Sequence, residues 1–256
     1  MTTMDLPYLV ERTLTIGASR ETVFRYFTEP ARWASWWGAG STIDAKAGGR
    51  LLIRYPNAVE AVGTVEAVEP PSRVVFTMGY PGGKPFPPDA SRVTITLEAV
   101  PEGTRLHLRH AVADASAREE FVQGWRYQLS LFANLVLDTE YADAAARVDR
   151  WFGALSEPEA AGRAERVRQL AAPDLAYRDR YSAVTGAAEL LAQVDAMHRF
   201  MPGFRVARTG EVLHRQGAVL TGWVQEGPGG APAGAGSAVI EFDGAGRVRS
   251  VTMFGG

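Results

Sequence analysis

One amphipathic helix constrains the fold of this chain more than any other stretch. Around residues 121–136, side chains recur at spacings of three, four and seven: Phe121, Trp125, Gln128, Leu129, Phe132 and Val136. Side chains at these spacings share one face of a helix. A helix this apolar needs a sheet to cover, and a long helix against a curved antiparallel sheet can enclose a pocket. We therefore expect the helix over 123–136 to close over the strands that precede it.

The composition limits the classes of protein that fit. A chain of 256 residues is long enough for one large or two small domains. The formal net charge is -2 and neither half is basic, which argues against a nucleic acid partner. The chain has no cysteine, so disulfides, thiol catalysis and zinc-cysteine sites are excluded.

The hydropathy pattern gives no sign of a membrane protein. No stretch approaches the roughly 20 apolar residues that a spanning helix requires. The first ten residues lack a basic segment followed by an apolar run, which is the pattern of a secretory signal. We expect a protein without a membrane span, and a cytoplasmic location follows by default.

Strands fill the chain before the long helix. A short helix is expected to interrupt them at Ser19, since serine is a favoured N-cap residue. We expect Pro30 to end that helix. Alternation of apolar and polar residues, with turn residues between the runs, predicts strands at 10–16, 50–55, 63–69, 73–80, 93–98 and 104–112.

Four motifs in this first part carry a family resemblance. They are Trp33 to Trp37, Gly48-Gly49-Arg50, the segment 63–77, and Gly124-Trp125 with its leucine-rich tail. Residues 8–137 resemble the Hsp90-ATPase-activator-like branch of the START/Bet v 1 (SRPBCC) superfamily. The resemblance implies a helix-grip domain over 1–139, in which a curved antiparallel sheet surrounds a long C-terminal helix with a cavity between them. Members include lipid and polyketide binders and aromatase/cyclases, and a few are co-chaperones.

Three aromatic or polar groups are candidates for this cavity. Trp33 and Trp37 either form a ligand mouth or plug the end of the core. On the strand 104–112, His110 shares a face with Leu106 and Leu108, whereas His107 faces the other way among arginines. His110 is either a hydrogen-bonding or acid-base group in the pocket, or a histidine at the strand end that bonds the backbone.

The long helix offers two further candidates. Trp125 lies on its apolar face and would contact a ligand. Gln128 lies on the same face, where it either bonds a carbonyl or hydroxyl group of a ligand or caps a strand group. No other side chain of this helix has the chemistry of a catalytic group in such a pocket.

The pattern changes after residue 140. Helices are predicted over 144–155, from Ser156 to about Leu170, and over 186–200. The second of these starts at Ser156-Glu157-Pro158-Glu159, a helix N-terminal signature. Strands are predicted at 175–181, 204–213, 218–225, 236–242 and 248–254.

This second part is similar to the SnoaL-like branch of the NTF2-like superfamily. The resemblance covers 141–256 and rests on Tyr177-x-Asp179, the helix from Gly186, Pro202-Gly203-Phe204, and Trp223. It implies an NTF2-like α+β cone over 140–256 whose mouth takes a small hydrophobic molecule. Because such cones often pair through their sheets, it also implies a homodimer through this domain.

In such a cone the candidate residues are Tyr177, Asp179, His198 and Trp223. Asp179 and His198 in one dry pocket could relay a proton at an enolisable carbon, with Tyr177 holding the enolate oxygen. Alternatively, Asp179 forms a salt bridge with a neighbouring arginine, and His198 is a charge at a helix C-terminus. The late acid-base aspartate of polyketide cyclases has no clear match, because Asp243 lies in a predicted turn.

Three functions of different classes follow for this α+β chain. The first is a two-domain binder of small hydrophobic molecules, with one apolar pocket in each domain. The second is a metal-independent cyclase or isomerase that uses Asp179 and His198. The third is a co-chaperone that stimulates an Hsp90-type ATPase. None of these requires a metal or a cofactor.

Overall fold

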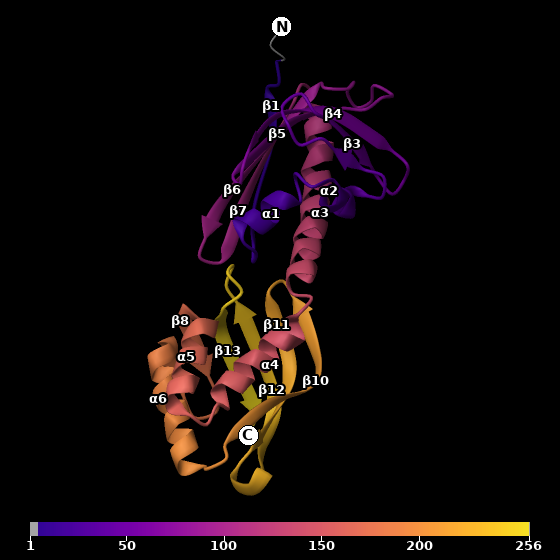
Figure 1. Cartoon of the computed structure of the whole chain (residues 1–256). Helices are drawn as coiled ribbons and strands as arrows, with labels where there is room; N and C mark the ends of the chain where they lie inside the picture. Colours follow the sequence, from indigo (N-terminus) through magenta and orange to yellow (C-terminus); the bar gives the residue numbers. More distant parts are fainter. Residues whose placement is uncertain (1–4, 256) are drawn as a thin grey trace. The chain divides into compact units, whose positions relative to one another are not determined.

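The computed structural model describes residues 5–255 and contains two compact units. The first unit ends at Val136 and the second begins at Leu137. Each unit combines one large, largely antiparallel sheet with helices (Figure 1). The α+β class expected from the sequence is therefore confirmed.

The first unit is built on a seven-stranded antiparallel sheet. Its strands lie in the order β1-β7-β6-β5-β4-β3-β2. Their bounds are β1 (Tyr8–Ile16), β2 (Thr42–Ile43), β3 (Arg50–Arg54), β4 (Glu60–Glu69), β5 (Arg73–Met78), β6 (Ser91–Val100) and β7 (Gly103–Val112). Strand β7 buries Leu106, Leu108 and His110 and leaves Arg105 and Arg109 exposed, so the predicted alternation is confirmed.

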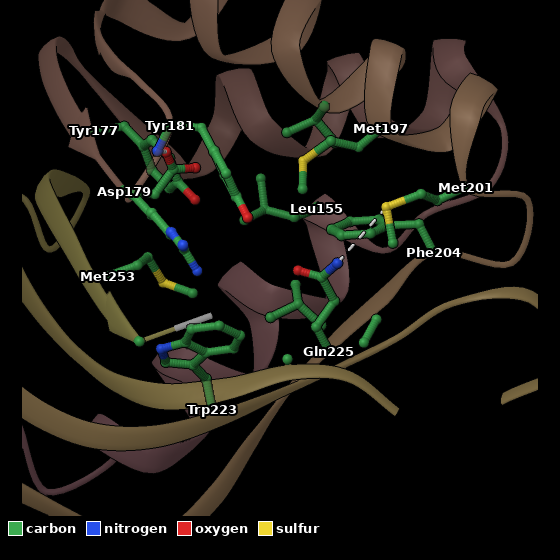
Figure 2. Close-up of a pocket in the computed structure, with 16 residues that line it drawn as sticks. Leu155, Tyr177, Asp179, Tyr181, Met197, Met201, Phe204, Trp223, Gln225 and Met253 are labelled. Atoms are coloured by element: carbon green, nitrogen blue, oxygen red, sulfur yellow. Dashed lines mark hydrogen bonds between the residues drawn. The ribbon is translucent and has the colours of Figure 1, made fainter. Parts of the chain in front are cut away.

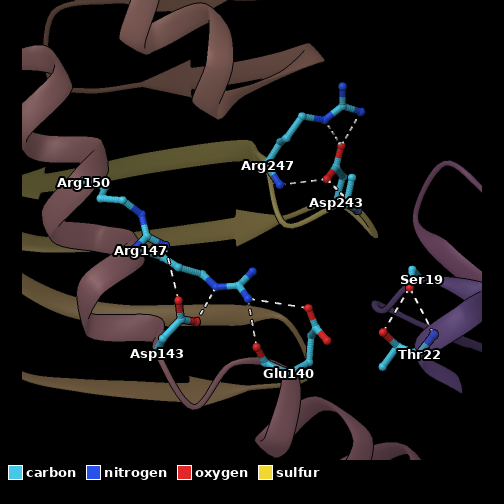
Figure 3. Close-up of polar contacts among 9 residues, drawn as sticks. Ser19, Thr22, Glu140, Asp143, Arg147, Arg150, Asp243 and Arg247 are labelled. Atoms are coloured by element: carbon cyan, nitrogen blue, oxygen red, sulfur yellow. Dashed lines mark hydrogen bonds and ion pairs between the residues drawn. The ribbon is translucent and has the colours of Figure 1, made fainter. Parts of the chain in front are cut away.

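Two short helices follow β1. Helix α1 (Arg20–Arg25) is capped by Ser19, whose hydroxyl oxygen accepts a hydrogen bond from the backbone N–H of Thr22 (Figure 3). We expected Pro30 to end this helix, but α1 ends at Arg25 and Pro30 begins helix α2 (Pro30–Trp37). A proline fits there because the first helical N–H needs no partner.

Helix α3 (Ala115–Glu140) is longer than the predicted stretch at both ends. Its apolar face packs into the core of the first unit, where Phe132 is fully buried. The ring of Phe132 lies 5.8, 4.9 and 4.9 Å from the ring centroids of Tyr26, Phe27 and Trp36, in that order. The long helix therefore joins the two short helices in one aromatic core.

The second unit is built on a six-stranded sheet. The strand order is β10-β11-β12-β13-β8-β9, and only the pair β13–β8 is parallel. The strands are β8 (Ala171–Arg178), β9 (Ala183–Thr185), β10 (Arg205–Arg215), β11 (Ala218–Glu226), β12 (Pro232–Phe242) and β13 (Val248–Gly255). A single 3-10 turn at Pro228–Gly230 precedes β12.

Three helices pack on this sheet: α4 (Ala144–Leu155), α5 (Ala160–Leu170) and α6 (Gly186–Phe200). Helix α4 packs on β10, and α6 packs on β8. The expected N-cap at Ser156 is wrong, because α5 begins only at Ala160. The hydroxyl of Ser156 instead bonds both backbone groups of Val206, at 2.9 Å each, and so joins the end of α4 to β10.

Within residues 5–255, no helix combines the length and the apolar character that are needed to cross a membrane.

Candidate functional site

The second unit encloses a cavity of about 360 Å³ between its helices and its sheet (Figure 2). Helix α6 provides Val194 and Met197, and β11 provides Trp223 and Gln225. The other lining residues are Leu155, Tyr177, Asp179, Arg180, Tyr181, Met201, Phe204, Val206, Ala233, Gly234, Met253 and Gly255. The volume lies within the range of small-molecule sites.

The wall of this cavity is mainly apolar and adaptable. Met197, Met201 and Met253 contribute flexible thioether side chains, which pack against ligands of different shape. Gln225 points from the sheet toward Met201 (Figure 2), and its Nε2 lies 3.9 Å from the Met201 sulfur. Sulfur is a weak acceptor, so the amide of Gln225 keeps most of its hydrogen-bonding capacity for a ligand.

Tyr177 and Asp179 both line the cavity, and a side-chain hydrogen bond joins them. Burial, and then the negative charge of Asp179, raise the pKa of Tyr177. The Oδ1 atom of Asp179 accepts hydrogen bonds from the backbone N–H groups of Tyr181 and Ser182, at 2.8 Å each. Its Oδ2 atom accepts from Nε2 of Gln193 at 3.0 Å. Asp179 therefore organises the turn after β8.

His198 does not line this cavity, although we expected it to share a pocket with Asp179. Its Nε2 lies 2.9 Å from the carbonyl oxygen of Leu155. A carbonyl oxygen only accepts, so Nε2 carries the proton and donates. The ring also packs edge-on against Phe204 at 5.1 Å. In this arrangement His198 ties α6 to the end of α4, and the expected proton relay is not assembled.

Trp223 lines the cavity as expected and is held in place by its indole N–H. The Nε1 atom lies 3.1 Å from the carbonyl oxygen of Ser237 and 3.2 Å from that of Phe254. Because the N–H is shared between these two strands, the ring forms a fixed apolar wall.

The acidic residue near the end of the chain is used by a turn. Asp243 is 5% exposed and accepts hydrogen bonds from the backbone N–H groups of Ala245 and Arg247. The guanidinium of Arg247 donates to its second oxygen (Figure 3). A neighbouring cation, Arg147, bonds Asp143 and the carbonyl oxygen of Glu140 (Figure 3). Its guanidinium carbon also lies 4.7 Å from the centre of the Tyr141 ring. Asp243 and Arg147 therefore stabilise the turns in which their partners lie.

The first unit has a second pocket, of about 340 Å³, between α2, α3 and the loop after β3. Of the expected ligand contacts, Trp37, Trp125 and Gln128 line it. The other lining residues are Trp36, Tyr55, Pro56, Asn57, Phe121, Gly124, Tyr127 and Leu131. Trp33 is fully buried in the core, where its Nε1 donates to the carbonyl oxygen of Leu52.

His110 is fully buried and does not line the pocket of the first unit. Its Nδ1 accepts a hydrogen bond from the indole N–H of Trp125 at 3.0 Å. This assigns the proton of the neutral ring to Nε2, which donates to Oγ of Ser91 at 2.8 Å. Ser91 donates in turn to the carbonyl oxygen of Met78. Burial lowers the pKa of His110 to about 3. We expected His110 either to face the pocket or to bond the backbone. It instead bonds two side chains inside the core.

Several cavity residues were not expected from the sequence. Gln225 follows Trp223 by two positions on one strand, so strand parity could have placed both on one face. Met197 and Met201 are four residues apart on the apolar stripe of the predicted helix from Gly186, so helical periodicity could have placed them on one face. Met253 lies on β13, and no sequence signal links it to these two. Among the described residues, no group of three or more His, Asp or Glu side chains could hold a metal ion.

One known family model matches most of the first unit. Residues 17–136 match the family model described as "Activator of Hsp90 ATPase homolog 1-like protein". The first unit matches this family. The match begins just after β1 and covers α1, α2, the strands β2 to β7, and α3 up to Val136. It confirms the resemblance seen in the motifs. No curated protein matches the chain.

Solved structures with similar parts include three whose identity to this chain is low. A putative isomerase of the SnoaL-like family from Agrobacterium tumefaciens is 22% identical, with coverage of 43% of this chain and 95% of that one and a TM-score of 0.41. A protein from Mesorhizobium loti is 24% identical (52% and 98% coverage, TM-score 0.47). The Aha1 dimer from Colwellia psychrerythraea is 17% identical (48% and 90% coverage, TM-score 0.42).

Proposed function

We propose that the chain is a two-unit binder of small hydrophobic molecules, with one site in each unit. In this proposal the first unit is a helix-grip domain and the second an NTF2-like cone of the SnoaL type. The pockets of about 340 and 360 Å³ are large enough for molecules of one or two rings or a medium-length chain.

The second-unit cavity carries the proposal. Its apolar wall supplies the hydrophobic contribution to binding, at roughly 25 cal/mol per Å² of buried apolar surface. Gln225 supplies one amide whose only described side-chain partner is the Met201 sulfur. An apolar cavity with one underused polar group is suited to a molecule with one polar end.

Replacement of Gln225 by leucine should weaken binding of a medium-chain ketone. We expect 2-decanone to bind the variant about 3- to 10-fold less tightly than the natural chain, because one net hydrogen bond is worth roughly 0.5–1.5 kcal/mol. Isothermal titration calorimetry on the full chain measures this change. The matched control is Glu226→Leu, because Glu226 is exposed at the end of the same strand and does not line the cavity.

Two results would count against this assignment. Equal affinities of the natural chain and the Gln225 variant would remove Gln225 from the site. No binding of any C8–C12 ketone, alcohol or two-ring aromatic compound to the full chain would overturn the proposal as a whole.

The enzyme alternative has less support. It needs Asp179 and His198 to act on one molecule, but His198 does not line the cavity and donates to the carbonyl oxygen of Leu155, and Asp179 holds a turn. The co-chaperone alternative is supported by the family description of residues 17–136. An ATPase assay of an Hsp90-type chaperone with the purified chain tests it, and an unchanged rate would contradict it.

The proposed homodimer through the second unit has a candidate surface. Leu213 and Leu220 face each other across β10 and β11 and are 53% and 45% exposed. A second copy would cover this pair. Sedimentation velocity of the full chain tests the proposal, and a monomeric mass at all concentrations would contradict it.

A further inference from the structure

Aromatic side chains form more than half of the lining of the first-unit pocket. Six of its eleven lining residues are aromatic, namely Trp36, Trp37, Tyr55, Phe121, Trp125 and Tyr127, and none is charged. Trp37 packs edge-on against Trp125 at 5.6 Å and against Tyr55 at 5.7 Å. Aromatic pairs favour stacked and edge-to-face geometries, so a planar ring fits such a wall better than a flexible chain.

Gln128 gives this pocket a defined polarity. Its Nε2 donates a hydrogen bond to the carbonyl oxygen of Trp36, and a carbonyl oxygen only accepts, so the amide has one allowed orientation. Its Oε1 then has no hydrogen-bond partner among the described residues. A carboxamide oxygen accepts, so the group that Gln128 offers to a ligand is an acceptor.

Gly124 leaves room at the edge of the same pocket. It lies inside α3, where glycine is less stable than alanine by roughly 0.8–1 kcal/mol. A Cβ atom built at Gly124 meets no other atom within 4 Å. Because Gly124 lines the pocket, any larger side chain there would occupy ligand space. The helix thus lacks a side chain at the position where one would narrow the pocket.

We propose that the first-unit pocket binds a planar aromatic molecule with an O–H or N–H donor, and that this donor bonds Oε1 of Gln128. The inference rests on the proposed function, because it assigns a ligand class to one of the two proposed sites. In this proposal Gln128 recognises the donor, and the six aromatic rings recognise the planar shape.

A matched pair of ligands tests the class. Isothermal titration calorimetry of the full chain should show that 2-naphthol, which has an O–H donor, binds about 3- to 10-fold tighter than 2-methoxynaphthalene, which has none. In Gln128→Leu the ratio of the two affinities should fall to about one. The difference between the two ratios isolates the hydrogen bond, as in a double-mutant cycle.

A pair of glycine variants locates the site. Gly124→Leu should weaken binding of both naphthalene compounds about 100-fold, whereas Gly153→Ala should leave their affinities unchanged. Gly153 is a suitable control because it also lies inside a helix with no atom within 4 Å of a built Cβ, but does not line this pocket.

The outcomes separate the two proposals. If Gln128→Leu keeps the preference for 2-naphthol, or if the natural chain has none, the ligand class is wrong while the pocket remains a binding site. If neither compound binds the natural chain, or if Gly124→Leu binds both as well as the natural chain does, the proposed first-unit site itself is contradicted.

Discussion

Replacement of His110 by leucine should lower the free energy of unfolding of the first unit by about 2–4 kcal/mol. The ring links Trp125 of α3 to Ser91 of β6, and all three side chains are at most 2% exposed. Leucine has a similar size but no polar atoms, so the indole N–H of Trp125 would stay buried without an acceptor. One such orphaned group costs roughly 1–3 kcal/mol, and the loss of the Ser91 partner adds to it. Urea denaturation followed by tryptophan fluorescence measures the change.

The pH dependence of the same variant tests whether the folded chain buries His110 as a neutral ring. In the folded chain burial lowers the pKa of His110 to about 3, whereas an unfolded histidine titrates near 6.5. The stability that neutral His110 contributes is therefore fully present above about pH 6.5. It is lost as the pH falls toward 3, at up to about 1.4 kcal/mol per pH unit.

The stability difference between the natural chain and His110→Leu should accordingly shrink between pH 6.5 and pH 4.5, because leucine does not titrate. Unfolding measured in urea at several pH values within this window tests this. A difference that stays constant over the window would contradict the lowered pKa of His110 in the folded chain.

The same residue shows how far the sequence could lead. Alternation along β7 correctly placed His110 on the buried face with Leu106 and Leu108. The partners of a buried polar group depend on tertiary packing, however, and Ser91 and Trp125 come from a different strand and from a helix. Periodicity of one element therefore predicts that a side chain is buried, but not what it bonds.

The second unit shows a similar limit. Tyr177, Asp179 and Trp223, which the sequence marked as candidates, line the cavity. His198 is only one helical residue from the cavity-lining Met197, but its ring bonds Leu155 at the end of α4. Which of two adjacent helical side chains enters a pocket depends on the crossing angle of the helix over the sheet, and the sequence does not state this angle.

At one predicted helix start, tertiary contacts outweigh the local capping signal. The residues from Ser156 to Glu159 have the pattern of a capping box, yet Ser156 ends α4 and bonds Val206 of β10. A capping residue contributes roughly 1 kcal/mol, and the two hydrogen bonds to a neighbouring strand offset its loss.

Two blocking variants should each remove one class of ligand from the full chain. Gly124→Leu fills the aromatic pocket from a position where a Cβ meets no other atom. Ala233→Trp fills the second-unit cavity from an exposed position at the start of β12. Because each side chain occupies the space of the ligand, we expect each loss of affinity to be on the order of 100-fold, or about 2.7 kcal/mol.

The central claim is that the chain holds two separate sites, and calorimetric titration of the natural chain and both variants tests it most directly. We predict that Gly124→Leu loses 2-naphthol and keeps 2-decanone, and that Ala233→Trp loses 2-decanone and keeps 2-naphthol. Loss of both compounds in either variant, or of neither compound in both variants, would contradict the claim.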